Sequence, residues 1–175
     1  LVSPWMENGT VLNYLEIHGH ANVDKLLYEV AQGLLYLHSR NYAHGDLRGA
    51  NILINQDQSA CLADFGLSVI SDATFSGSST RAGSIYWMAP ELIDPDHFGG
   101  KFKTPASDVY AFGCVCVEAN LRSETYPVAM FKIVTGTRPE RPPGMLDMLW
   151  QCINTYWVDD PAARPATEVV VQNMM

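Results

Sequence analysis

The sequence predicts a mainly α-helical domain of the α+β class with one small β-hairpin. In several segments apolar residues recur at three- and four-residue steps, which is the spacing of a helix that buries one face. Elsewhere two short apolar runs flank a polar turn, as in a hairpin. The 175 residues suffice for one domain with a sizeable core, without an internal repeat or a long low-complexity linker.

The first and clearest helical pattern lies between residues 22 and 39. Asn22 can cap its start, and the apolar positions that follow keep the helical spacing. These positions are Val23, Leu26, Leu27, Val30, Leu34, Leu35 and Leu37. We therefore expect a helix that is buried on one face.

A small hairpin is expected next. The runs 52–54 and 60–62 are apolar, and the segment 55–58 between them has the Asn, Gln and Asp composition of a turn. Residues 71–84 are rich in Ser, Thr and Gly and contain few large apolar groups, so we expect a mobile loop there.

Three further helices are expected in the second half of the chain. Ser107 can cap a helix over residues 108–119 that is apolar nearly all round and therefore belongs in the middle of a core. Residues 145–156 show the helical spacing again. A last helix is expected over 167–175, after a loop that contains two prolines.

The composition argues against several classes of function. Eleven Lys and Arg residues against nineteen Asp and Glu residues give a formal net charge of −8, which disfavours binding to nucleic acid or an anionic membrane surface. No apolar run reaches about 18 residues, so no membrane span is expected. The four cysteines lack zinc-site spacing, and we expect reduced thiols in an intracellular, cytoplasmic protein.

Three motifs occur in a fixed order along the chain. They are His44-Gly45-Asp46-Leu47-Arg48-Gly49-Ala50-Asn51, then Asp64-Phe65-Gly66, then Ala89-Pro90-Glu91. This order and these gaps resemble the catalytic loop, magnesium loop and substrate-loop anchor of a eukaryotic protein kinase. The resemblance implies a partial kinase domain over residues 1–175, namely a hinge at 1–6 and a C-terminal lobe whose activation segment is 64–91.

The resemblance assigns chemical roles to three polar residues. Asp46 would take the proton from the attacking hydroxyl, while Asn51 and Asp64 would bind Mg²⁺ that bridges the ATP phosphates. A single Asp in a loop is most often a turn former or a helix cap, so the assignment depends on the combined spacing. The implied cofactors are ATP and Mg²⁺, and the implied partner is a protein substrate.

The adenine contacts implied by the resemblance lie in the hinge and the hairpin. Ser3 would be the gatekeeper, and the Pro4 carbonyl and the Met6 backbone would hydrogen-bond the adenine. Leu53 would form the floor under the ring, although an apolar strand residue is by default a core residue.

Two residues depart from the usual kinase pattern. Gly45 stands where the family usually has an Arg that pairs with a phosphate on the activation loop. Phosphorylation would therefore lack this anchor at Ser76, Ser78, Ser79 or Thr80. Arg48 stands where serine/threonine kinases usually have Lys and where some tyrosine kinases have Arg. Either cation could lie near the transferring phosphate, although the Arg fork is planar.

The acceptor specificity is indicated by the end of the activation segment. Ser84 resembles the hydroxyl residue of serine/threonine kinases that bonds to the catalytic Asp. The run from Trp87 to Glu91 resembles the tyrosine-kinase-like group. Together they favour a serine/threonine kinase with tyrosine-kinase-like features.

Further residues match structural positions of the family. His44 would brace Phe65, and Asp108 would hold the backbone of the catalytic loop. Glu91 and Arg164 would form a buried ion pair.

Two functions remain open from the sequence. One is an ATP-dependent protein kinase, and the other is a catalytically dead kinase-like remnant that binds proteins. The chain starts without an initiator Met, and we expect a fragment whose upstream lobe carries the glycine-rich loop and the phosphate-binding Lys. We expect this fragment to be inactive alone. The connection over 119–131 is shorter than usual, and the oligomeric state is not predicted.

Overall fold

The computed structural model describes residues 5–19, 22–64, 69–70, 84–98, 102–121, 132 and 136–175. The longer helices are α1 (Val11–His18), α2 (Val23–Ser39), α5 (Pro105–Asn120), α7 (Asp147–Tyr156) and α8 (Thr167–Asn173). The short helices are η1 (Gly49–Asn51), η3 (Ser84–Trp87), α3 (Pro90–Ile93), α4 (Pro95–Phe98) and η4 (Pro161–Ala163). The strands are β1 (Tyr42–Ala43), β2 (Ile52–Ile54), β3 (Ala60–Leu62) and β4 (Val69–Ile70).

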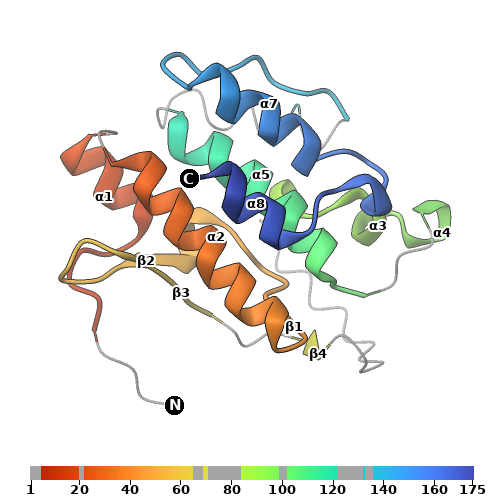
Figure 1. The fold of residues 1–175 in the computed structure, drawn as a ribbon, viewed down its shortest axis with the longest axis horizontal. Coiled ribbons are helices and arrows are strands. Elements are labelled where there is room, and N and C mark those ends of the chain that lie inside the picture. The colour runs from red at the N-terminus through yellow and green to blue at the C-terminus, as the bar shows by residue number, and fades with distance from the viewer. Residues whose placement is uncertain are drawn as a thin grey trace.

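Helix α5 lies at the centre of the core. In Figure 1 it crosses the middle of the molecule, and α2, α7 and α8 all pack against it. Every residue from Ser107 to Ala119 is buried, as expected for a helix that is apolar nearly all round. The predicted central helix is therefore confirmed.

The predicted start of α5 was wrong by three residues. Thr104 is the N-cap, and its hydroxyl accepts a hydrogen bond from the Ser107 amide. Ser107 in turn accepts one from the Thr104 amide, so the two residues form a reciprocal capping box. Pro105 fits the first turn because the backbone N–H that proline lacks would have no helical partner there.

Helix α2 and the β2–β3 hairpin form the second part of the core. The hairpin is antiparallel, with Leu53 opposite Cys61, and it lies against α2. Gly33 permits this contact, because a Cβ at that position would lie only 3.0 Å from the Leu62 Cδ1 atom. The helix and the hairpin predicted from the sequence are both present.

Several elements were not predicted. Helix α1 begins after the N-cap Thr10, and its residues Val11, Tyr14 and Leu15 are buried. The two-residue strands β1 and β4 pair antiparallel and bring residues 69–70 beside the start of the catalytic loop. The helices predicted over 145–156 and 167–175 are present with shorter bounds, 147–156 and 167–173.

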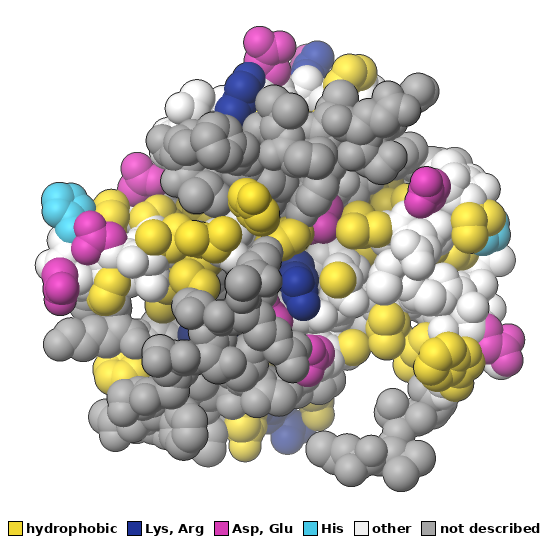
Figure 2. Space-filling model, turned by 180° about the vertical axis from the view of Figure 1, so that it is seen from behind, with side chains coloured by type: hydrophobic (Ala, Val, Ile, Leu, Met, Phe, Trp, Pro, Cys, Tyr) yellow, Lys and Arg dark blue, Asp and Glu magenta, His cyan; other side chains and the backbone are white. Residues whose placement is uncertain are grey.

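The remaining features are the surface, the cysteines and the expected loop. On the face shown in Figure 2 hydrophobic side chains form a band across the middle, while most charged side chains lie nearer the edge. Among the described residues no helix is long and apolar enough to cross a membrane. All four cysteines are unpaired, and Cys114 and Cys116 are buried. Of the loop predicted to be mobile over residues 71–84, residues 71–83 lie outside the described residues, and Ser84 is the first residue of η3.

Candidate active site

The catalytic loop is tied to the first turn of α5. Asp108 is only 2% exposed, and its two carboxylate oxygens accept hydrogen bonds from the amides of His44 (2.7 Å) and Gly45 (2.8 Å). A buried carboxylate needs such donors, because an unpaired charge in the core is costly. The loop therefore takes its position from the central helix.

His38 extends this network to two other helices. Its Nε2 atom lies 2.8 Å from Asp108 Oδ2, and its Nδ1 atom lies 2.6 Å from the Thr167 hydroxyl. The ring thus connects α2, α5 and α8 beneath the loop. His38 belongs to no local motif, because its partners lie 70 and 129 residues further along the chain.

His44 joins the two loops that carry the candidate site. Its Nε2 atom lies 3.1 Å from the Ala63 carbonyl oxygen, and its Nδ1 atom lies 3.3 Å from the Asp46 amide. Burial lowers the pKa of this histidine, while the charges of Asp108, Asp46 and Asp64 act in the opposite direction. A neutral ring that donates from Nε2 and accepts at Nδ1 fits these contacts. Phe65, the predicted contact of His44, lies outside the described residues.

Two residues of these loops have left-handed backbone angles. Gly45 has φ of 76°, which glycine adopts without steric cost. Asp64 has φ of 61°, which is uncommon for a residue with a Cβ and is often found at functional sites.

Asp46 and Asn51 lie side by side in the catalytic loop. The Asn51 Nδ2 atom donates to the Asp46 carbonyl oxygen at 2.7 Å and to its carboxylate Oδ2 at 3.1 Å. Both residues are buried, at 8% and 6% exposure. No residue in the described ranges donates a hydrogen bond to the remaining Asn51 oxygen, Oδ1. An amide oxygen is therefore available beside a carboxylate whose orientation is fixed.

Arg48 also lies near Asp46 and faces the same carboxylate oxygen, Oδ2, as Asn51 does. Its Nε atom is buried, has no hydrogen-bond partner within the described part of the chain, and lies 3.9 Å from Asp46 Oδ2. A buried guanidinium N–H without an acceptor is costly, so an anionic group bound at this position would stabilise it.

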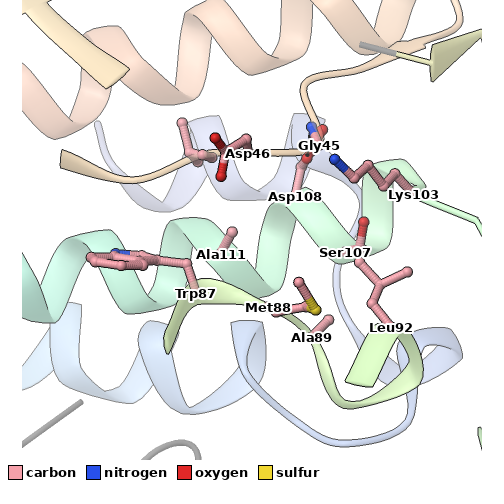
Figure 3. Close-up of a pocket in the computed structure, with 11 residues that line it drawn as sticks. Gly45, Asp46, Trp87, Met88, Ala89, Leu92, Lys103, Ser107, Asp108 and Ala111 are labelled. Atoms are coloured by element: carbon pink, nitrogen blue, oxygen red, sulfur yellow. Dashed lines mark hydrogen bonds between the residues drawn. The ribbon is translucent and has the colours of Figure 1, made fainter. Parts of the chain in front are cut away.

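A small cavity opens beside Asp46, as Figure 3 shows. Gly45, Asp46 and Asp108 form part of its polar end together with Lys103. The segment Trp87–Ala89 and Leu92 form an apolar wall. Burial lowers the pKa of Lys103, while Asp46 and Asp108 act to raise it. Lys103 lies in none of the sequence motifs described above.

Glu118, near the end of α5, links the catalytic loop to the segment before α3. Its Oε2 atom accepts hydrogen bonds from the Gly49 amide at 2.9 Å and from the Trp87 indole at 2.8 Å. Glu118 is 3% exposed, so these donors stabilise a buried carboxylate. Its role was also missed, since its partners lie 69 and 31 residues away.

The ion pair expected between Glu91 and Arg164 is present. Two parallel hydrogen bonds join the guanidinium and the carboxylate, at 2.6 and 2.7 Å. Arg164 also donates to the carbonyl oxygens of Val158, Ala106 and Asp159. The pair therefore connects α3 to the loops on either side of η4.

The other candidate residues are only partly described. Ser3 and Pro4 lie outside the described residues, and of Ser84 only the backbone, within η3, is described. Met6 is half-buried, and the segment that follows it reaches β2 through a bridge between Thr10 and Leu53. Within the described ranges no three His, Cys, Asp or Glu side chains form a metal-binding group.

Comparison with known proteins identifies the class. Residues 1–174 match the protein tyrosine and serine/threonine kinase family, so the chain belongs to the protein kinase family. Kinases of this family generally use ATP and Mg²⁺ to phosphorylate proteins. The helical lobe with its small antiparallel hairpin agrees with the C-terminal lobe of such an enzyme.

The relatives include both tyrosine and serine/threonine kinases. The chain is 33% identical over 177 residues to the tyrosine-protein kinase Abl of Drosophila melanogaster, covering 94% of this chain and 11% of that protein. It is 33% identical over 122 residues to the serine/threonine-protein kinase dst4 of Dictyostelium discoideum, covering 67% and 25%. It is 35% identical over 185 residues to the cytokinesis protein sepH of Emericella nidulans, covering 99% and 13%. The chain thus spans a quarter or less of the length of these relatives.

Proposed function

We propose that this lobe transfers the γ-phosphate of ATP to a serine or threonine hydroxyl of a protein, with Asp46 as the general base. The contact between Asp46 and Asn51 carries this proposal. One amide nitrogen holds both the backbone and the carboxylate of Asp46, so the carboxylate keeps one orientation. A fixed carboxylate can accept the proton of an incoming hydroxyl, and positioning of this kind supplies much of the catalysis of phosphoryl transfer.

The donor set beside Asp46 suits Mg²⁺. The Asn51 Oδ1 atom accepts no hydrogen bond from a described residue, and Asp64 follows the carbonyl that His44 contacts. An amide oxygen and a carboxylate are ligands that Mg²⁺ prefers. Asn51 and Asp64 would hold the metal ion, and bound Mg-ATP supplies the transferable phosphoryl group.

Arg48 would neutralise negative charge beside Asp46 Oδ2, the oxygen that Asn51 also contacts. Its buried Nε–H lacks an acceptor within the described ranges and lies 3.9 Å from Asp46 Oδ2. An anionic group held beside Asp46 would satisfy this donor. Met6 and Leu53, with Ser3 and Pro4, would contact the adenine.

The choice of a serine or threonine acceptor is supported by the sequence of the activation segment. Ser84 provides a hydroxyl near the end of this segment, and the run from Trp87 to Glu91 resembles the tyrosine-kinase-like group. The relatives include both specificities, so the acceptor needs a direct measurement.

A radiolabelled phosphate-transfer assay on the full-length protein that contains this lobe tests the proposal. We expect Mg²⁺-dependent transfer to a generic protein substrate, and a loss of roughly 10²- to 10⁴-fold in kcat for Asp46→Asn. Analysis of the labelled amino acids should show phosphoserine or phosphothreonine. Asp64→Asn should raise the Mg²⁺ requirement.

Lys25→Met is a matched control for these variants. Lys25 lies on α2 and pairs with Glu29, remote in sequence from the catalytic loop, so its loss should leave turnover unchanged. Full activity in the Asp46→Asn variant would refute the proposed base. No transfer by the folded wild-type protein would favour the second function considered above, a binding module.

A further inference from the structure

Lys103 is placed opposite the proposed base. It lies two residues before α5, and Figure 3 shows its amine directed toward Gly45 at the polar end of the cavity. Gly45 has no side chain, so nothing from that position occupies the space in front of the ammonium. Asp46 lines the same cavity.

Among the described residues, the ammonium of Lys103 has no direct partner. Lys103 is half-buried, yet it makes no hydrogen bond or ion pair with any residue in the described ranges. Asp108 is already engaged by two loop amides and His38, and Asp46 Oδ2 is engaged by Asn51. Burial lowers the pKa of Lys103, although the carboxylates of Asp46 and Asp108 act to raise it. The two negative charges therefore do not fully offset the cost of burying the ammonium.

Within the described residues, the cavity is lined by other residues than those proposed to bind ATP and Mg²⁺. Its apolar wall comes instead from Trp87, Met88, Ala89 and Leu92, in and beside the end of the activation segment. The cavity volume of about 30 Å³ has room for roughly two water-sized groups, which is the size of a carboxylate.

From these observations we propose that Lys103 makes this enzyme select protein substrates that carry an Asp or Glu carboxylate next to the acceptor hydroxyl. This inference rests on the proposed kinase function. The hydroxyl lies at Asp46, and the neighbouring carboxylate enters the cavity and accepts a charge-assisted hydrogen bond from Lys103. The apolar wall excludes water from this bond and so strengthens it.

A peptide panel tests the selection. Each peptide has one Ser or Thr acceptor in a neutral background, and a single neighbouring position holds either Glu or Gln. We expect the full-length wild-type protein to prefer one Glu peptide by roughly ten- to a hundredfold in kcat/KM, the size of a charge-assisted hydrogen bond. The preference should appear mainly in the peptide KM.

Substitutions at Lys103 separate its charge from its packing. Lys103→Met should abolish the preference and leave the KM for ATP unchanged, whereas Lys103→Arg should retain it. Lys103→Glu should invert it, so that a peptide with Lys at the same position becomes the better substrate. Lys25→Met, which removes a lysine from α2, should keep the wild-type preference.

Other outcomes would overturn the inference. Equal kcat/KM for the Glu and Gln peptides in active wild-type protein would refute the selection and leave the kinase proposal intact. A preference for phosphoserine over Glu would refute a carboxylate as the occupant. If no phosphate transfer is found, peptide binding measured by fluorescence anisotropy still decides, because equal affinity of wild type and Lys103→Met for the Glu peptide would refute the role of Lys103.

Discussion

At the scale of single residues, the ion pair of Glu91 and Arg164 is the clearest determinant of stability. Both side chains are almost completely buried and joined by two hydrogen bonds. Removing one partner leaves the other charge buried without compensation. We therefore expect Glu91→Ala or Arg164→Ala to lower the free energy of unfolding by about 3–5 kcal/mol in urea denaturation.

The double variant and a surface pair provide the controls. Replacing both Glu91 and Arg164 should cost less than the sum of the two single changes, because no unpaired charge remains. Lys25 is an exposed residue of α2 that forms an i,i+4 pair with Glu29, and Lys25→Met, which breaks this pair, should cost at most about 1 kcal/mol. Additive losses at Glu91 and Arg164 would show that the two charges are not coupled.

Some residues of the site could be predicted from the sequence and others could not. Asp46 and Asn51 lie five residues apart in one motif, so a local pattern was enough to bring them together. Glu118 and His38 gained their partners, and Lys103 its place in the cavity beside Asp46, only through folding, from segments distant in the sequence. A buried Glu in an apolar helix was a usable signal for Glu118, because a buried charge needs a partner.

At the scale of elements, α1 packs closely against the catalytic loop at Gly49. A Cβ built on Gly49 would lie 2.8 Å from the Leu12 Cγ atom and 3.0 Å from the Glu118 Cδ atom. Real atoms do not approach this closely, so either α1 or the loop would have to move. We expect Gly49→Ala to lower the free energy of unfolding by about 1–3 kcal/mol, as overpacking does.

A second substitution checks the cause of this loss. Leu12→Ala removes the nearest atoms, so Gly49→Ala should cost less in that background than in the wild type. Chemical denaturation of the four proteins gives the interaction energy as a double-mutant cycle. An unchanged cost of Gly49→Ala in the Leu12→Ala background would mean that α1 is not the obstacle.

The elements that were predicted are those with strong local signals. Helix α2 and the β2–β3 hairpin have regular apolar spacing or a clear turn. The strands β1 and β4 contain two residues each and exist only because the chain folds back on itself, so no periodicity could reveal them. For α5 the apolar pattern identified the helix, whereas the Thr104 capping box decided where it begins.

At the scale of the whole molecule, the core is organised around α5. Helices α2, α7 and α8 are among those that pack on it, and the catalytic loop and the Trp87 side chain hydrogen-bond to Asp108 and Glu118 at its two ends. A polar residue inside such a helix is costly unless it has a partner, and these two carboxylates have theirs in the site. The same helix therefore stabilises the lobe and positions its chemistry.

This architecture predicts how the four thiols react. Cys114 and Cys116 lie on α5 with no exposed surface, and burial raises the pKa of both thiols. Cys61 and Cys152 are partly exposed, although burial and Glu29 also raise the pKa of Cys61. Because the thiolate is the reactive form, we expect only Cys61 and Cys152 to be alkylated in the folded protein. The alkylation of Cys61 should become faster as the pH is raised, because more of this thiol is then ionised.

Mass spectrometry of the four cysteine peptides measures the alkylation rate of each thiol, and a double variant isolates the two buried thiols. In the double variant Cys61→Ser/Cys152→Ser, Cys114 and Cys116 should be alkylated only as fast as the lobe unfolds. Even at raised pH, their alkylation in the folded variant should stay slower than that of Cys61 in the folded wild-type protein. Exposing α5 requires the loss of its contacts with α2, α7 and α8 together, so these two thiols should report global unfolding. Rapid alkylation of Cys114 or Cys116 without denaturant would instead show that α5 opens locally, and the site that it holds in place would open with it.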